Sequence, residues 1–331
     1  TINRAAFLAP NITTTGTLTA FSACAGTASA EQNFQVSGTD LSDTLIITAP
    51  AGFEISLTSG GVFSSDIKLL PVSNTVVNTT IYVRLSAAAT GTPSGDISCS
   101  STGATSVNIA VTGTVSPAPS TADAGPNKTA CVSPGTLTMA AVVPAVGTGA
   151  WTFINGPATP SIISTSSATT NIVGLTTVGT YTFRWTVSGA APCASNFDEM
   201  QVVVNANPSP FTVTGGGVFC QNTPVTLTAP TDPNYTYQWS RSLSGIANPN
   251  SYADLSGEVN DTLLANAPGN YRAIVTNQFG CSVADSAAVQ MGDYVFNGSL
   301  ATGDAQQTGR LNRFAVVSTC ASPKACPLTF T

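Results

Sequence analysis

Eight cysteines are the residues of this chain best suited to covalent chemistry, and the chain contains no histidine. The cysteines are widely separated, without the CxxC spacing or the histidine ligands of a zinc site. Disulfide bonds are therefore the favoured interpretation, and they place the protein in an oxidising compartment outside the cytoplasm. Neither a metal site nor a cofactor is predicted.

Two parts of the chain repeat each other around their cysteines. Cys131 opens CVSPGTLTMAA and Cys220 opens CQNTPVTLTAP, and another cysteine follows them after 62 and 61 positions, as Cys193 and Cys281. The recurring spacing predicts one bond inside each repeat, and elimination leaves a bond inside the first part of the chain. The predicted pairs are Cys131–Cys193, Cys220–Cys281, Cys24–Cys99 and, as a small local loop, Cys320–Cys326. Each long bridge would stabilise its own module by about 4 kcal/mol.

The residue inventory argues against an enzyme. Without histidine, no Ser-His-Asp or Cys-His arrangement can form, and the commonest general base is missing. Asp and Glu number 16 and are dispersed, and the adjacent pair Asp198 and Glu199 lies where a loop should enter a strand. Neighbouring residues of a strand point to opposite faces, so these two carboxylates should diverge and could not flank one substrate.

Carboxylates near predicted turns leave calcium binding as an alternative. Asp40, Asp43, Asp123 and Asp232 are the candidates, because carboxylate and carbonyl oxygens are the ligands that Ca²⁺ takes. No Asp-x-Asp-x-Asp loop is present, so solvated turn carboxylates are the favoured interpretation.

Three tryptophans could stack on sugar rings if they were exposed. Trp151, Trp185 and Trp239 all fall within predicted strands, so filling of the hydrophobic core is favoured.

Composition excludes two classes of partner. Charged residues make up 8% of the chain, and the formal net charge is -6. The 10 Lys and Arg are scattered, so no basic stripe is available for phosphates, and nucleic acid is not a predicted partner. No run of 18 apolar residues occurs, so no transmembrane segment is predicted.

Short strands with period-two alternation run through the chain, separated by turns rich in Gly, Pro, Asn and Asp. An example is the stretch GTYTFRWTV at 179–187, in which Tyr181, Phe183, Trp185 and Val187 would line one face. The predicted fold class is all-β, with tandem immunoglobulin-like β-sandwich domains in series, stapled by disulfides.

Length and proline content predict the division into domains. The 331 residues fit three sandwiches of about 100 residues with a remainder. Pro-containing stretches at 116–121 and 205–210 interrupt the strand pattern and resemble linkers. The predicted units are residues 1–116, 117–206 and 207–290, followed by a partial β unit or assembly segment at 291–331.

Several motifs resemble repeats of secreted surface proteins of Bacteroidota. The run ADAGPNKTAC at 122–131 resembles the opening of their PKD-like and Ig-like repeats, and YQW at 237–239 with PGNY at 268–271 is similar to their Ig-like repeats. Another β-sandwich repeat of the same proteins is similar to the stretches VSGTDL (36–41), APAGFEI (49–55) and IYVR (81–84). The start of a domain common near their C-termini is similar to GSLATGD (298–304), GRL (309–311) and CASPKAC (320–326). The resemblance implies export by the type IX system and a place at the cell surface.

The same resemblance implies O-glycosylation, which in Bacteroidota modifies Ser or Thr after Asp and before an apolar residue. Three positions match: Thr44 in Asp43-Thr-Leu, Thr262 in Asp261-Thr-Leu, and Ser286 in Asp285-Ser-Ala. Glycans would hydrate a surface that carries few charges and would cover exposed strand edges.

The predicted function is an extracellular stalk or fibre segment of a surface adhesin. A variant is a filament subunit that polymerises by strand addition, with the opening residues 2–8 as a candidate donor strand. Partners would be neighbouring subunits, further domains of a longer chain, or surface glycans. The alternative is a non-catalytic repeat region of a secreted polysaccharide-degrading enzyme.

Overall fold

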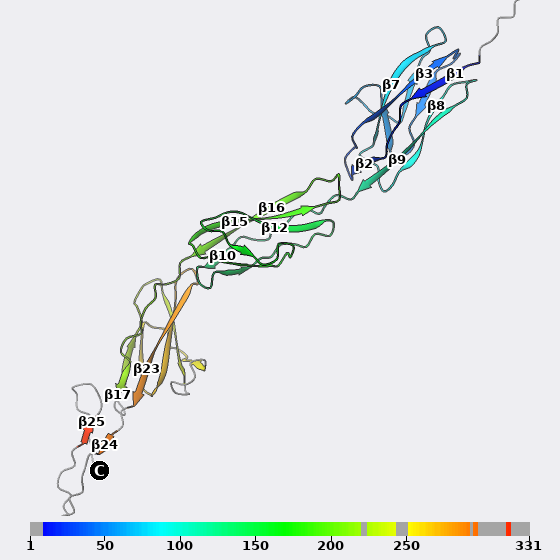
Figure 1. Ribbon diagram of the computed structural model, residues 1–331. Helices are drawn as coiled ribbons and strands as arrows, with labels where there is room; N and C mark the ends of the chain where they lie inside the picture. Colours follow the sequence, from blue (N-terminus) through cyan, green and yellow to red (C-terminus); the bar gives the residue numbers. More distant parts are fainter. Residues whose placement is uncertain (1–8, 220–223, 243–250, 292–293, 297–315, 319–331) are drawn as a thin grey trace, which may run out of the picture.

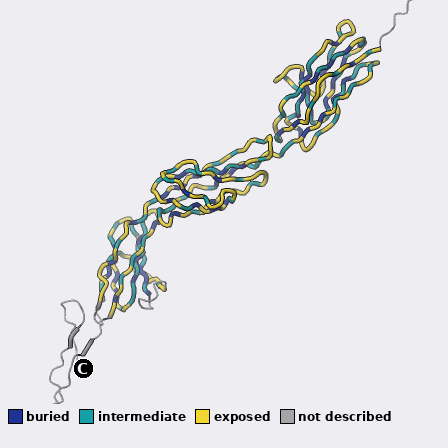
Figure 2. The backbone as a smooth tube through the Cα atoms, in the orientation of Figure 1, coloured by how far each residue is buried: buried dark blue, intermediate teal, exposed yellow. Residues whose placement is uncertain are grey.

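The structure is a computed structural model that describes residues 9–219, 224–242, 251–291, 294–296 and 316–318. Every regular element in these residues is a β-strand. Buried apolar residues form three separate clusters in chain order, spanning 12–111, 122–204 and 213–289. The clusters define three units, here called domains 1, 2 and 3, which lie end to end (Figures 1 and 2).

Domain 1 consists of two sheets with the strand orders β1-β3-β7-β5 and β2-β9-β8-β4-β6. Its strands are β1 (Asn11–Thr15), β2 (Phe21–Cys24), β3 (Gln32–Thr39), β4 (Leu45–Thr48), β5 (Phe53–Ser56), β6 (Asp66–Leu69), β7 (Val76–Leu85), β8 (Ser94–Ser100) and β9 (Val107–Ser116).

Domain 2 pairs the sheet β10-β16-β15-β12 with the sheet β11-β14-β13. Its strands are β10 (Lys128–Cys131), β11 (Thr136–Thr138), β12 (Thr148–Asn155), β13 (Ser161–Ile162), β14 (Asn171–Val173), β15 (Gly179–Ser188) and β16 (Asn196–Asn205).

Domain 3 pairs the sheet β17-β23-β22-β19-β20 with the sheet β18-β21. Its strands are β17 (Gly217–Phe219), β18 (Val225–Thr228), β19 (Thr236–Ser242), β20 (Tyr252–Asp254), β21 (Thr262–Ala265), β22 (Gly269–Thr276) and β23 (Ser282–Met291). Beyond it, β24 (Tyr294–Phe296) pairs with β25 (Val316–Ser318). The rest of the predicted segment 291–331, with Cys320 and Cys326, lies outside the described residues, as does the candidate donor segment 2–8.

All three domains share one strand plan. A short early strand runs parallel to the last strand, as β2 beside β9, β10 beside β16, and β17 beside β23. In domains 2 and 3 the third residue of the penultimate strand is a tyrosine whose hydroxyl donates to a backbone carbonyl four residues earlier: Tyr181 to Thr177 and Tyr271 to Ala267. This tyrosine corner is a hallmark of the immunoglobulin fold. The predicted class is confirmed, because the chain is a series of immunoglobulin-like β-sandwiches.

The cores follow the predicted alternation. Tyr181, Phe183, Trp185 and Val187 are each at most 1% exposed, along one face of β15. Trp151 on β12 lies opposite Trp185, with ring centroids 5.1 Å apart.

The corresponding tryptophan of domain 3, Trp239 on β19, is fully buried and donates its indole N–H to the carbonyl of Asn260. All three tryptophans therefore fill cores, as favoured from the sequence, and none is available to stack on a sugar.

Cys99 contradicts the predicted bond to Cys24, because it is a free thiol, fully buried on β8 in the core of domain 1. Register explains the separation of the two cysteines. On β9, Val107 pairs with Cys99 and Ser116 pairs with Cys24. These two positions of one strand are about 30 Å apart. Bonded cysteines have Cα atoms within about 7 Å, so the two cannot join.

Burial should also make the Cys99 thiol inert. Desolvation raises the pKa of Cys99 from 9.0 to about 11, and only the thiolate reacts with alkylating reagents. We expect iodoacetamide at pH 8 to leave Cys99 unlabelled in the native protein and to label it fully in denaturant, as quantified by mass spectrometry of the Cys99 peptide. Labelling at the rate of an unfolded peptide would contradict the burial.

Candidate functional site

The described disulfides lie between domains, and each of the two joins neighbouring domains. Cys24 of domain 1 is bonded to Cys193 of domain 2, and Cys131 of domain 2 is bonded to Cys281 of domain 3. The bonds with the linkers beside them are here called junction 1 (Cys24–Cys193, linker 117–121) and junction 2 (Cys131–Cys281, linker 206–210).

Both junctions have the same construction. The first cysteine ends the short early strand of one domain, where that strand runs beside the end of the last strand: Cys24 pairs with Ser116, and Cys131 pairs with Asn205. The second cysteine lies in the turn between the last two strands of the next domain, β15–β16 for Cys193 and β22–β23 for Cys281. The bond thus runs beside the peptide linker, and two covalent connections cross each junction.

The predicted pairing within domains is therefore wrong, and strand direction gives the reason. Within domain 2, Cys131 lies beside the last residue of β16, whereas Cys193 precedes the first. A strand of this length spans about 30 Å, so the two cysteines lie at opposite ends of the sandwich. Cys281 is likewise bonded to Cys131 and not to Cys220, which lies outside the described residues.

Few polar contacts connect domains 1 and 2 across junction 1, although Ser120 of the linker is held to domain 2 by hydrogen bonds with Val146 and Asn196. The Ser116 hydroxyl donates to the carbonyl of Ala191 at 2.9 Å, and the sulfur of Cys193 lies 3.4 Å from the carbonyl oxygen of Pro117. Gly189 packs closely on Pro119, where an added Cβ would come within 3.0 Å of the proline ring. The disulfide is thus the principal fixed connection beside the backbone.

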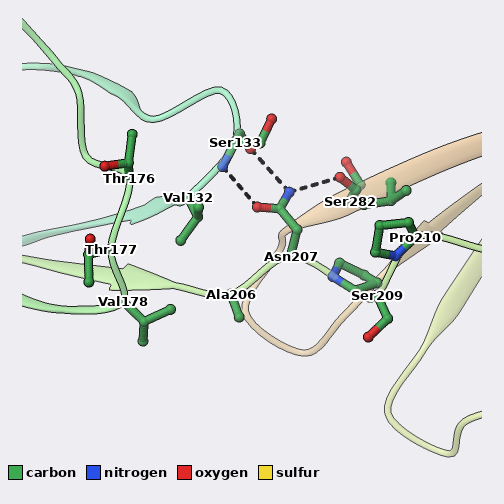
Figure 3. A pocket seen from close by; sticks show the side chains of 12 residues that line it. Val132, Ser133, Thr176, Thr177, Val178, Ala206, Asn207, Ser209, Pro210 and Ser282 are labelled. Carbon is green, nitrogen blue, oxygen red and sulfur yellow. Dashed lines mark hydrogen bonds between the residues drawn. The ribbon is translucent and has the colours of Figure 1, made fainter.

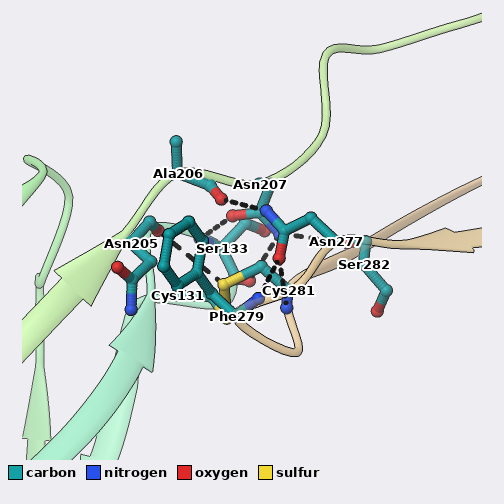
Figure 4. The surroundings of a disulfide bond; sticks show 9 residues. All are labelled: Cys131, Ser133, Asn205, Ala206, Asn207, Asn277, Phe279, Cys281 and Ser282. Atoms are coloured by element: carbon teal, nitrogen blue, oxygen red, sulfur yellow. Dashed lines mark hydrogen bonds between the residues drawn. A yellow bond between two sulfur atoms is a disulfide. The ribbon is translucent and has the colours of Figure 1, made fainter. Parts of the chain in front are cut away.

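Junction 2 adds a network of asparagines around its disulfide (Figure 4). The Asn207 side chain accepts from the amide of Ser133 at 2.9 Å and donates to the carbonyls of Ser133 and Ser282, so it bridges domains 2 and 3. Asn277 donates to the carbonyl of Ala206 and holds the turn of Cys281 by accepting from its amide. Neither asparagine is predicted from the sequence, and the position of an Asn beside a Pro-rich linker is the only sequence signal that points to Asn207.

Replacing Asn207 by Ala should loosen junction 2 without unfolding either domain. The Ser133 amide loses its side-chain acceptor, a change of about 1 kcal/mol that should speed its hydrogen exchange several-fold. The matched control is Asn127→Ala, because Asn127 accepts from the Gln201 amide inside domain 2. Unchanged exchange at Ser133 in the Asn207 variant would contradict the bridging role.

A groove opens beside the linker of junction 2 (Figure 3). Its lining is apolar or hydroxylic apart from the amide of Asn207, includes Val132, Thr177, Val178 and Pro210, and holds no charged side chain. A second groove, in domain 3, contains Asp232 and Asp261 with Tyr235 and Tyr237. Two of its polar side chains are engaged internally: Asp261 accepts from the Thr231 hydroxyl, and the Tyr237 hydroxyl donates to the carbonyl of Pro230. Neither groove presents a pair of unengaged acid and base groups.

Of the four carboxylates considered for calcium, three accept hydrogen bonds from neighbouring groups, whereas Asp40 lies in the bend after β3 with a positive φ of 56°. Asp43 accepts from the Thr102 hydroxyl and from the Thr44 amide, and these bonds lower the pKa of Asp43. Asp123 and Asp232 each accept from an amide two residues on, as turn carboxylates do. Within the described residues, no three side chains of His, Cys, Asp or Glu are grouped as metal ligands.

The pair Asp198 and Glu199 diverges, as predicted from strand geometry. Asp198 accepts from the Ala124 amide at 2.8 Å, and Glu199 pairs with Arg184 at 2.6 Å. Each carboxylate therefore has a structural partner on its own side of β16.

The three candidate glycosylation positions differ in exposure. Thr262 on β21 and Ser286 on β23 are exposed, whereas Thr44 is half-buried in the turn before β4. Each preceding aspartate has a structural role, because Asp43 and Asp261 bind threonine hydroxyls and Asp285 accepts from the Val213 amide.

Comparison with known proteins finds similarity at the level of solved structures alone. No family model and no curated protein matches the chain. A three-domain immunoglobulin fragment of titin is 10% identical, with 86% of this chain and 99% of that chain covered and a TM-score of 0.37. Extracellular domains 3–5 of Drosophila OTK are 11% identical, covering 83% and 95%, with a TM-score of 0.29.

The PKD domain of the KIAA 1837 protein is 24% identical and covers 28% of this chain and 92% of that one, with a TM-score of 0.25. The fold assignment rests on the sheets and tyrosine corners described above. Across the described parts of the chain, no helix has the length and apolar character needed to cross a bilayer.

Proposed function

We propose that this chain is a structural and adhesive stalk segment of a secreted bacterial surface protein, exported by the type IX system. The observation that carries the proposal is that the described disulfides join successive domains. Their presence fits an oxidising, extracellular location. In this proposal residues 1–116, 117–206 and 207–290 are the three stalk modules, and 291–331 begins a further unit or an assembly segment.

Two covalent connections at each junction suit a stalk. Domains of one chain move relative to each other by default unless their interface is large and hydrophobic. Here the polar contacts between domains 1 and 2 are few, so a linker alone would leave the two domains free to rotate relative to each other. A disulfide beside the linker removes most of that freedom and holds successive domains extended.

Negative-stain images of the purified chain test this stalk geometry. The wild type should give extended particles with a narrow spread of angles between domains 1 and 2. Cys24→Ser with Cys193→Ser should broaden that spread while leaving the angle between domains 2 and 3 unchanged, which makes junction 2 the internal control. Equal spreads in the two proteins would contradict the proposal.

Surface display is tested on intact cells of the source bacterium. Antibodies raised against domain 1 should label unpermeabilised cells by immunogold, with the label displaced from the outer membrane. Label that appears only after permeabilisation would overturn the extracellular assignment. Regular filaments forming from the purified chain would support the finer variant, in which subunits add strands to each other's exposed sheet edges.

Glycosylation at Thr44, Thr262 and Ser286 belongs to the same proposal. The exposed hydroxyls of Thr262 and Ser286 support it, as does a described surface with ion pairs only at Arg84–Glu54 and Arg184–Glu199. Material from the native host should exceed the polypeptide mass, and Thr262→Ala and Ser286→Ala should each remove one increment. An intact mass equal to the bare polypeptide would refute it.

A further inference from the structure

The two disulfides overlap along the chain, because Cys131 lies between Cys24 and Cys193, and Cys193 lies between Cys131 and Cys281. The shortest covalent route from residue 9 to residue 291 therefore does not follow the backbone. It runs along 9–24, crosses to Cys193, returns through domain 2 to Cys131, crosses to Cys281 and ends along 281–291.

We infer that the disulfides route tension around domains 1 and 3, so that domain 2 is the single described domain whose unfolding lengthens the stalk appreciably. In domain 1 the route contains β1 and β2 alone, and β3–β9 stay slack even if they unfold. In domain 3 it contains β23, and β17–β22 stay slack. In domain 2 it contains β11–β15, because it runs from Cys131 to Cys193, whereas β16 lies outside it.

The route sets an upper limit on extension. It contains about 90 residues, or about 30 nm at 3.3–3.6 Å per residue, whereas the backbone from 9 to 291 would reach about 100 nm. The limit follows from covalent connectivity and does not depend on the proposed role at the cell surface.

The direction of pulling within domain 2 also follows from the junctions. Tension enters at Cys193, in the turn between β15 and β16, and leaves at Cys131, beside the end of β16. These points lie at opposite ends of the sandwich. Domain 2 therefore bears the tension along its long axis, through the sheet β10-β16-β15-β12. The stability of its core sets the force at which domain 2 unfolds and the stalk lengthens.

Single-molecule pulling on the full chain, with handles ligated enzymatically to both ends, tests the inference. Relative to wild type, Cys24→Ser with Cys193→Ser should lengthen the fully extended chain by about 16 nm, and Cys131→Ser with Cys281→Ser by about 9 nm. All four substitutions together should add about 70 nm, far more than the sum of the two separate gains. The reason is that either disulfide alone still provides a covalent route that bypasses most of the backbone. Cys99→Ala should add nothing.

Bonds inside domains would give a different pattern, because each substitution would then release its own loop and the gains would add. In that case Cys24→Ser with Cys193→Ser would add about 50 nm and Cys99→Ala about 26 nm, and either result would overturn the inference. Gentle reduction of the wild type repeats the test without substituting the buried Cys281.

A matched pair of tryptophan variants identifies the domain that yields. Trp151→Ala in domain 2 should lower the force of the main lengthening step, whereas Trp239→Ala in domain 3 should leave that force unchanged. A lower force with Trp239→Ala, or a wild-type step in which domain 1 or domain 3 lengthens the chain by more than about 10 nm, would contradict the inference.

Discussion

Cutting the linker between domains 1 and 2 should leave the protein in one covalent piece. A protease recognition site inserted after Ala118 follows two exposed residues, Pro117 and Ala118, and it lies inside the loop closed by Cys24–Cys193. After complete cleavage, the chain should run on a non-reducing denaturing gel as one species of 33.4 kDa plus the insert. With a reducing agent it should separate into two fragments.

The control for this experiment is the same inserted chain with Cys24→Ser and Cys193→Ser, which should fall into two fragments without reduction. A site placed in the linker at 206–210 should behave in the same way through Cys131–Cys281. Separation of the unsubstituted chain without a reducing agent would mean that the bond of that junction is not formed.

Replacing Trp239 by Ala should unfold domain 3 selectively. Trp239 is fully buried in the core of domain 3, and its indole N–H donates to the carbonyl of Asn260. The substitution removes both the packing of the ring and this hydrogen bond. Truncations of this kind cost about 3–5 kcal/mol, a large part of the stability of one small domain. Hydrogen exchange in β22 and β23 should accelerate by two orders of magnitude or more, while β15 and β16 of domain 2 keep their protection.

Trp239→Phe is the milder comparison, because it retains most of the ring volume and loses the indole hydrogen bond. The loss of stability in Trp239→Phe should be clearly smaller than the loss in Trp239→Ala. Alkylation of Cys99 provides an internal check that domain 1 stays folded in both variants. If the exchange of β22 does not change in Trp239→Ala, the tryptophan does not hold the domain together.

The sandwiches could be predicted because their signals are local. Alternation in 179–187 identifies a strand with one buried face, and the buried row from Tyr181 to Val187 follows directly. The tyrosine corner, likewise, needs a tyrosine near the start of one strand and a carbonyl four residues earlier. No long-range knowledge is required for either feature.

The junctions could not be predicted in the same way, because their geometry depends on which end of a sandwich each cysteine reaches. The matching separations of Cys131 to Cys193 and of Cys220 to Cys281 reflect a repeated strand plan and not a repeated bond. Placing Cys193 in the turn after the tyrosine-corner strand β15 would have put it at the opposite end of the sandwich from Cys131. Because Cys193 cannot reach Cys131, a cysteine of the neighbouring domain is the remaining candidate for its bonding partner.

The free thiol of Cys99 could not be predicted from the number of cysteines. An even number of cysteines favours full pairing, and elimination then assigned Cys99 to Cys24. The alternating pattern of β8 places Cys99 among inward-facing residues with Ile97, where a free cysteine behaves as a small apolar side chain.

Peptide mapping of the unreduced protein tests the central claim most directly. Trypsin leaves Cys193 and Cys220 on one peptide, so a second protease that cuts at Asp198 is needed to separate them. The structure predicts that the peptide with Cys24 is linked to the one with Cys193, that the peptide with Cys131 is linked to the one with Cys281, and that Cys99 is recovered as a free thiol. Linked peptides joining Cys131 to Cys193, or Cys24 to Cys99, would contradict the account of the junctions.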